Sequence, residues 1–171
     1  MGLAETMGLA SFDLTVGPRA MQRIGCTKAG TAAFSVVLGP LDEVSHRLSK
    51  GRFTIGRSLG GLPVAMLTTT GRRSGQLRTS PVNVIPVGGD VGLVASNYGR
   101  GRPPAWALNL RANPRAVVTH KATDYDVEAT EVDGNMYETI FAAALTVYPG
   151  YAAYRRRSTG VIPIFLLEEA Q

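Results

Sequence analysis

The chain has very few residues of the kinds that hold metals or form disulfides. Its 171 residues include one cysteine, Cys26, and two histidines, His46 and His120. One cysteine cannot form an intrachain disulfide, and the two histidines have no further ligands at the spacing that zinc sites use. The sequence therefore predicts neither a disulfide framework nor metal catalysis.

Long apolar segments are also missing. The run from Ala32 to Leu38 is bounded by Gly30 and Gly39, and it is far shorter than the roughly 18 residues that a membrane-spanning helix needs. The first residues lack the basic region and the long apolar region of a secretory signal. We therefore expect a cytoplasmic protein, and peripheral contact with a membrane surface stays open.

Acidic residues are scarce in the middle of the sequence. Between residues 44 and 123 the only carboxylate is Asp90. The basic residues in that stretch are Arg47, Lys50, Arg52, Arg57, Arg72, Arg73, Arg78, Arg100, Arg102, Arg111, Arg115 and Lys121. Scattered surface arginines usually serve solubility, but several of these flank glycine-rich turns and have no acidic neighbours in the sequence. The central region is therefore predicted to bind an anion.

The length and composition fit one compact domain. Hydrophobic residues make up 44% of the chain, and 20 glycines and 10 prolines suit strands joined by tight turns. Residues 1–49 show no clear period apart from a short amphipathic stretch at 41–48, and are predicted to be a helical or partly mobile lead-in. Residues 50–171 are predicted to form the folded cofactor-binding domain.

From Pro63 onward the pattern is that of an antiparallel sheet with a few helices. Strands are expected at 64–70, 76–87, 91–96, 116–119, 125–132 and 162–167, and helices at 105–111, 135–147 and 151–157. Tight turns at 71–75 and 88–90 make the first hairpins antiparallel. No dinucleotide fingerprint, P-loop or nucleophile elbow occurs. The pattern favours an α+β fold, a small antiparallel barrel with appended helices.

The segment Leu67–Pro81, LTTTGRRSGQLRTSP, resembles a signature of the deazaflavin-dependent nitroreductase family. The likeness continues through VASNYG at 94–99, PAWALNLRANP at 104–114, YPGY at 148–151 and IPI at 162–164. It covers roughly residues 60–167 and implies a split β-barrel related to FMN-binding barrels. The resemblance also implies the cofactor, coenzyme F420 (an 8-hydroxy-5-deazaflavin), and hydride transfer to a quinone, an enone or a nitroaromatic compound.

The same resemblance implies a cofactor site around the glycine-rich turn. Arginines and backbone amides suit phosphodiesters, and glycine lets the main chain approach closely. The expected cofactor-binding residues are Arg72, Arg73, Ser74, Gly75, Arg78, Pro81, Ala95, Ser96, Asn97, Ala105 and Trp106. Of these, Pro81, Ala95, Ala105 and Trp106 are expected to border the ring system. Trp106 also suits a core aromatic, and the family usually has Gly where Tyr98 stands, often after a Lys.

Three tyrosines are candidates for the binding site of the electron acceptor. Tyr148, Tyr151 and Tyr154 stand three residues apart beside the Pro149–Gly150 break, so they can share one face of a bent helical segment. The resemblance implies that they line the acceptor pocket as the candidate catalytic residues. A phenol can stack on a flat acceptor and donate a hydrogen bond to the oxygen that gains charge. A packed tyrosine stripe is the alternative.

Two other interpretations stay open at this point. A split-barrel reductase could use FMN, which also presents a phosphate and a tricyclic ring. A basic groove could instead belong to a non-catalytic carrier or a binder of single-stranded nucleic acid, but aromatics are sparse around the arginines and no RNA-binding motif occurs. The expected partner is a small-molecule electron acceptor rather than a nucleic acid, and a homodimer stays open.

Overall fold

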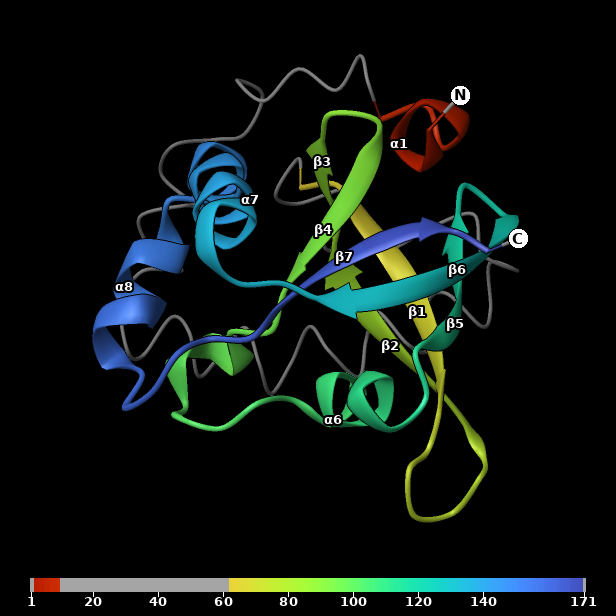
Figure 1. Cartoon of the computed structure of the whole chain (residues 1–171), viewed down its shortest axis with the longest axis horizontal. Coiled ribbons are helices and arrows are strands. Elements are labelled where there is room, and N and C mark those ends of the chain that lie inside the picture. Colours follow the sequence, from red (N-terminus) through yellow and green to blue (C-terminus); the bar gives the residue numbers. More distant parts are fainter. Residues whose placement is uncertain (1, 10–61, 171) are drawn as a thin grey trace.

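The computed structural model of the chain describes residues 2–9 and 62–170. These residues contain one seven-stranded sheet, in the order β2-β1-β5-β6-β7-β4-β3, in which every neighbouring pair is antiparallel. The strands are β1 (Val64–Thr70), β2 (Leu77–Asn83), β3 (Ile85–Val87), β4 (Asp90–Val94), β5 (Arg115–His120), β6 (Thr123–Glu131) and β7 (Ile164–Glu169). The helices are α1 (Leu3–Thr6), α6 (Ala105–Ala112), α7 (Gly134–Val147) and α8 (Gly150–Arg157), arranged around the curled sheet (Figure 1).

The two edge strands of this sheet are consecutive in the chain. β2 ends at Asn83 and β3 begins at Ile85, so the fully buried Val84 alone joins them. Because β2 and β3 stand at opposite ends of the strand order, the sheet must curl until its edges meet at Val84. The single strand expected over 76–87 is therefore two strands. Pro81 lies in edge strand β2, the position in a sheet where a residue without an N–H is tolerated.

The other elements agree with the sequence pattern to within about three residues. The strand expected at 64–70 is β1, and the helix expected at 135–147 is α7, which begins one residue earlier after Asp133. The last strand begins at Ile164 rather than Ile162. The helix expected at 41–48 and the boundary after residue 49 lie outside the described residues. No helix in the described part of the chain is long and apolar enough to span a membrane.

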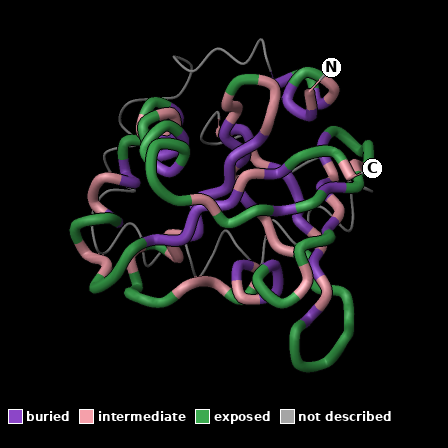
Figure 2. Tube along the Cα trace, in the orientation of Figure 1, coloured by how far each residue is buried: buried purple, intermediate pink, exposed green. Residues whose placement is uncertain are grey.

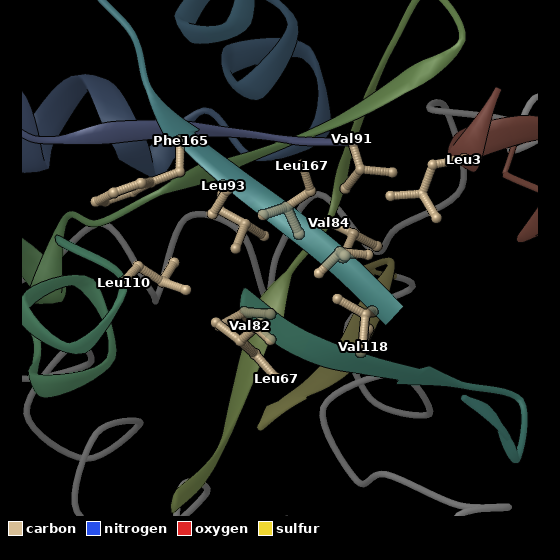
Figure 3. Close-up of a cluster of buried hydrophobic side chains, with 14 of the residues drawn as sticks. Leu3, Leu67, Val82, Val84, Val91, Leu93, Leu110, Val118, Phe165 and Leu167 are labelled. Carbon is tan, nitrogen blue, oxygen red and sulfur yellow. The ribbon is translucent and has the colours of Figure 1, made fainter. Parts of the chain in front are cut away.

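Buried side chains form two clusters, one on each side of the curled sheet. The cluster inside the barrel includes Leu67, Val82, Leu93 and Phe165, and Leu3 of α1 joins it (Figure 3). The second cluster, which includes Ile140, lies beneath α7 and α8. Burial of such aliphatic and aromatic side chains stabilises each cluster by roughly 1.5–3 kcal/mol per side chain. The barrel is therefore a rigid support for its edge strand and loops.

Candidate active site

The turn between β1 and β2, residues 71–76, and the first two residues of β2 are together named here the arginine turn. Its backbone is closed by hydrogen bonds from the Gly71 N–H to the Gln76 carbonyl and from the Gly75 N–H to the Gly71 carbonyl, each 2.8 Å. Gly75 has a φ of 66°, a left-handed conformation that favours glycine. The turn projects from the body of the molecule, and Arg72, Arg73, Ser74 and Gly75 are all exposed (Figures 1 and 2).

Asn109 of α6 fixes the base of the arginine turn. Its side-chain amide donates to the Thr69 hydroxyl at 3.0 Å, and its side-chain oxygen accepts from the Arg72 backbone N–H at 3.1 Å. The Thr69 hydroxyl donates to the Arg78 carbonyl at 3.4 Å. Both Asn109 and Thr69 are buried. Asn109 was not among the predicted site residues. The sequence signal that could have marked it is a polar residue between Ala107 and Leu110 on the apolar face of a short helix.

The positive charge of the arginine turn is not compensated by carboxylates in the part of the chain that the structure describes. The ion pairs there are Arg111–Glu131 at 2.6 Å and Arg155–Glu138 at 3.0 Å, and neither involves the turn. Arg78 donates to the neutral Gln76 side-chain oxygen at 3.2 Å. An exposed cluster of guanidinium groups with free N–H donors is suited to phosphate or carboxylate oxygens.

The loop that follows β4 is closed by its own polar groups. Asn97 and Tyr98 have φ values of 43° and 59°, and Asn is among the non-glycine residues that enter this left-handed region most readily. The Asn97 side-chain amide donates to the Arg102 carbonyl at 3.0 Å, and the Ser96 carbonyl accepts from the Gly99 N–H at 2.8 Å. Ala95 is buried. Asn97 therefore shapes the loop, and any cofactor contact would come from its remaining atoms or from Ser96.

Two of the residues expected to border the cofactor ring, Ala105 and Trp106, lie in the first turn of α6. Ala105 is exposed, whereas Trp106 is half-buried and packs edge-on against Phe165, with ring centroids 5.9 Å apart. Trp106 is therefore a core-packing aromatic with one part still accessible. Its contact with the cofactor stays a prediction.

The edge strand β2 has two faces, and the expected site residues are divided between them. Val82 lies in the barrel core, so Arg78 and Ser80 point to the same side, opposite their β1 partners Thr69 and Leu67. Pro81 and Asn83 point to the outer side. A ligand that touches both Arg78 and Pro81 must therefore cross the edge of the sheet, and β2 forms that edge.

Tyr148, Tyr151 and Tyr154 lie together and are named here the tyrosine cluster. Their ring centroids are 5.6 Å apart for Tyr148–Tyr151 and 5.9 Å for the other two pairs. The Tyr148 and Tyr154 hydroxyl oxygens are 3.3 Å apart. Gly150 is required here, since a Cβ at that position would lie 2.2 Å from the Tyr148 ring. Tyr151 and Tyr154 are buried and Tyr148 is half-buried.

The tyrosine cluster contacts the outer face of β2 through one hydrogen bond. The Asn83 side-chain amide donates to the Tyr151 hydroxyl oxygen at 3.1 Å. Burial raises the pKa of the Tyr151 phenol far above its ordinary value, and the hydrogen bond from Asn83 opposes part of that rise. Tyr151 therefore stays protonated across the neutral range. Sequence reasoning missed Asn83, because a contact between residues 68 positions apart leaves no local pattern.

The edge strand β2 places the cationic and the aromatic groups in one elongated arrangement. Asn83 is two residues from Pro81 on the same face, about 7 Å along the strand, and five residues from Arg78, about 17 Å. One end offers uncompensated cations, the middle offers the small apolar Pro81, and the other end offers neutral aromatic rings. These residues fit an elongated cofactor that has a polyanionic tail and a flat ring system.

Comparisons with known proteins identify the family of the chain. A family model for the F420H(2)-dependent quinone reductases matches residues 42–169. An F420H(2)-dependent quinone reductase of Mycobacterium tuberculosis is 29% identical over 133 residues, which cover 74% of this chain and 87% of the relative.

Solved structures show the same fold. An F420-H2 dependent reductase is 34% identical, with a TM-score of 0.58, over 62% of this chain and 94% of the other. A domain-swapped dimer is 30% identical, with a TM-score of 0.60, over 75% of this chain and 99% of the other. The split β-barrel is thereby confirmed, and so is coenzyme F420 rather than FMN as the cofactor. The chain belongs to the F420H(2)-dependent quinone reductase family and is an oxidoreductase that uses coenzyme F420.

Proposed function

We propose that this enzyme reduces a quinone bound between the outer face of β2 and the tyrosine cluster. The observation that carries the proposal is the hydrogen bond from Asn83 to Tyr151. It joins a phenol to the same strand face that carries Pro81, the expected border of the cofactor ring. A reacting ring at Pro81 would then have a proton donor about two residues away along β2.

The arginine turn would hold the anionic part of the cofactor. Arg72, Arg73 and Arg78 supply guanidinium donors, and Ser74 supplies a hydroxyl. The Gly75 N–H is used within the turn, so Gly75 contributes its lack of a side chain, which lets a ligand approach the backbone closely. Asn109 holds the Arg72 backbone in place before any ligand binds, so little ordering of the turn is left to occur on binding.

The ring end of the cofactor is proposed to lie beside β2, the loop after β4 and the start of α6. Pro81, Ala95, Ala105 and the accessible part of Trp106 are proposed to border the ring, and Ser96 and Asn97 to contribute neutral polar contacts. Bound there, the reduced cofactor supplies a hydride to the acceptor. The protein's part is to orient the two flat molecules and to exclude water between them.

The tyrosine cluster suits a quinone for two reasons. Its rings are neutral and aromatic, so they can pack against a flat uncharged acceptor. Reduction of a quinone also places negative charge on an oxygen, which a protonated phenol can stabilise by hydrogen bonding and proton donation. Tyr148, Tyr151 and Tyr154 are therefore proposed as the catalytic residues, with Tyr151 as the proton donor.

The oligomeric state and the cellular location of the protein are also proposed. The domain-swapped dimer among the similar structures supports a homodimer for this chain. We propose that it acts in the cytoplasm on a small-molecule acceptor. Peripheral contact with a membrane surface stays a prediction.

The proposal is tested first by equilibrium titration with oxidised F420, reduced F420 and FMN. We expect both forms of F420 to bind more tightly than FMN, because the arginine turn can also contact the acidic tail that FMN lacks. The oxidation of reduced F420 is then followed with a naphthoquinone, a cyclic enone and a nitroaromatic compound. Tighter binding of FMN would contradict the proposal that the arginine turn binds the acidic tail of F420. Turnover with the nitroaromatic compound alone would contradict the proposal that the acceptor is a quinone.

A further inference from the structure

Among the described residues, the Tyr151 hydroxyl group has a hydrogen-bond partner for its oxygen but not for its proton. Its oxygen accepts a hydrogen bond from the Asn83 amide at 3.1 Å. The described residues offer no acceptor for its proton. The hydroxyls of Tyr148 and Tyr154, in contrast, are within hydrogen-bond distance of each other. Since buried hydroxyl groups normally find partners for both their oxygen and their proton, the Tyr151 proton is left available to a bound molecule.

We propose that Asn83 is a positioning residue for catalysis: its side-chain amide occupies the Tyr151 oxygen and so directs the phenol proton toward the oxygen of the acceptor. This inference rests on the proposed role of the tyrosine cluster. It adds a residue from the opposite side of the site, on a strand that sequence reasoning connected only with the cofactor.

Asn83 is proposed to assist the transfer of the Tyr151 proton to the acceptor. The acceptor receives a hydride, with its two electrons, from the reduced cofactor, and negative charge gathers on the acceptor oxygen. The Tyr151 O–H bond breaks, its proton forms a new O–H bond on the acceptor, and the bonding pair stays on the phenol oxygen. That oxygen still faces the Asn83 N–H, which stabilises its new charge. A proton from water then restores the phenol.

The protein surroundings suit Asn83 to this task. The residue pairs with Val64 at the end of the β1–β2 ladder and immediately precedes the buried Val84, so its backbone is held on both sides. Its amide donates a hydrogen bond without adding a charge to a buried aromatic cluster. Burial raises the pKa of Tyr151 and keeps the proton in place until the acceptor needs it, while the Asn83 bond lowers that pKa and eases the transfer.

The test is a double-mutant cycle in the full-length protein loaded with reduced F420, with a water-soluble naphthoquinone as acceptor. We expect Asn83→Ala to lower kcat by about 10- to 100-fold, because one hydrogen bond to a developing charge is lost. F420 affinity should not change. Tyr151→Phe should cost at least as much, and the double variant should be no slower than Tyr151→Phe alone, because Asn83 acts through the phenol. Asn135→Ala, which alters an exposed asparagine on α7, is the matched control and should leave kcat unchanged.

A second variant separates positioning from packing. In Asn83→Asp an ionised carboxylate cannot donate to the phenol and instead accepts its proton, so kcat should be low at neutral pH. Activity should recover as the pH falls and the carboxyl group becomes a donor. Additive losses in the double variant, or an Asn83→Asp pH profile parallel to that of the wild type, would overturn the proposal.

A readout that does not depend on activity is the side-chain amide signal of Asn83 in a ¹⁵N–¹H spectrum. That signal should shift in Tyr151→Phe and stay in place in Tyr148→Phe, where the ring and the Asn83 contact both remain. An unshifted signal in Tyr151→Phe would overturn the hydrogen bond and with it the inference. Failure of the proposed function appears differently, as a wild-type protein that binds F420 but reduces no quinone.

Discussion

The arginine turn and the tyrosine cluster lie at opposite ends of the same edge strand and are built in opposite ways. The turn is exposed, cationic and held to the body by a few hydrogen bonds to Asn109. The cluster is largely buried, neutral and held by ring packing, with Asn83 as its polar contact to β2. One region is therefore suited to bind by charge and the other to hold a reacting group in a dry setting.

This difference has consequences for what mutations should do. Exposed arginines contribute little to folding, so their loss should change cofactor affinity and leave stability intact. Buried tyrosines contribute to packing and are proposed to contribute to the chemistry, so only the smallest substitution, Tyr→Phe, separates the two. The residues that anchor each region, Asn109 and Asn83, are where folding and function should be coupled.

The largest effect is expected from Tyr151→Phe. Loss of a general acid typically costs about 10²- to 10⁴-fold, so kcat/KM with a quinone should fall within that range. F420 affinity and melting temperature should stay near wild type because the ring is kept. Steady-state kinetics and thermal unfolding measure both, with Tyr148→Phe and Tyr154→Phe as matched variants. Full turnover by all three variants across several acceptors would leave the cluster with only a shape-setting role, and lost stability without a specific rate effect would support simple packing.

The next largest effect is expected from Asn109→Ala. The change leaves the Arg72 N–H without its acceptor and the buried Thr69 hydroxyl oxygen without its donor, which should lower the free energy of unfolding by about 2–4 kcal/mol. F420 affinity should fall as well, because the arginine turn loses its anchor. Denaturant unfolding with an unchanged m-value, followed by F420 titration, checks both. Asn113→Ala, just beyond the end of the same helix, serves as the control and should cost less than about 1 kcal/mol. If Asn109→Ala keeps full F420 affinity, the turn needs no preorganisation.

Smaller effects, confined to binding, are expected from Arg73→Ala and Arg78→Ala. Each should weaken F420 binding by about 1.5–3 kcal/mol, the range for hydrogen bonds to charged groups. The losses should shrink at high salt because the turn is exposed. Fluorescence titration at two salt concentrations measures them, with Lys121→Ala as an exposed cation remote from the turn. Unchanged affinity and unchanged circular dichroism in both arginine variants would show that the turn is ordinary surface charge.

The smallest effect concerns the Arg111–Glu131 ion pair that ties α6 to β6. The hydrogen bond from Arg111 lowers the pKa of Glu131, so the pair stabilises the fold above the unfolded-state pKa and loses this contribution as pH falls through the lowered pKa. Because the side chains are 43% and 37% exposed, the contribution at neutral pH should be only about 0.2–1 kcal/mol. The difference in unfolding free energy between wild type and Glu131→Gln should be present at pH 7 and should vanish in acid. A difference that persists in acid would rule out the ion pair as its source.

The sequence alone predicted the fold class and most of the elements in their order, and its resemblance to a known family implied the cofactor. Strand β1, helices α6 and α7, and the turn at 71–75 follow from local patterns, because alternation, helical period and glycine-bracketed turns act over a few residues. The residues of the arginine turn and the three tyrosines could also be selected in advance, since each set is contiguous or evenly spaced in the chain.

Only the tertiary structure decided how these pieces meet. Closure of the barrel at Val84 ends β2 and begins β3 at the opposite edge of the sheet, and no local signal marks the residue where the chain changes edges. The contacts Asn109–Thr69 and Asn83–Tyr151 join residues 40 and 68 positions apart. Such pairings depend on strand register and helix packing, which are set by the burial of the whole core. The sequence therefore indicates which side chains are chemically suited to the proposed site, and the packing of the fold determines which of them are in contact.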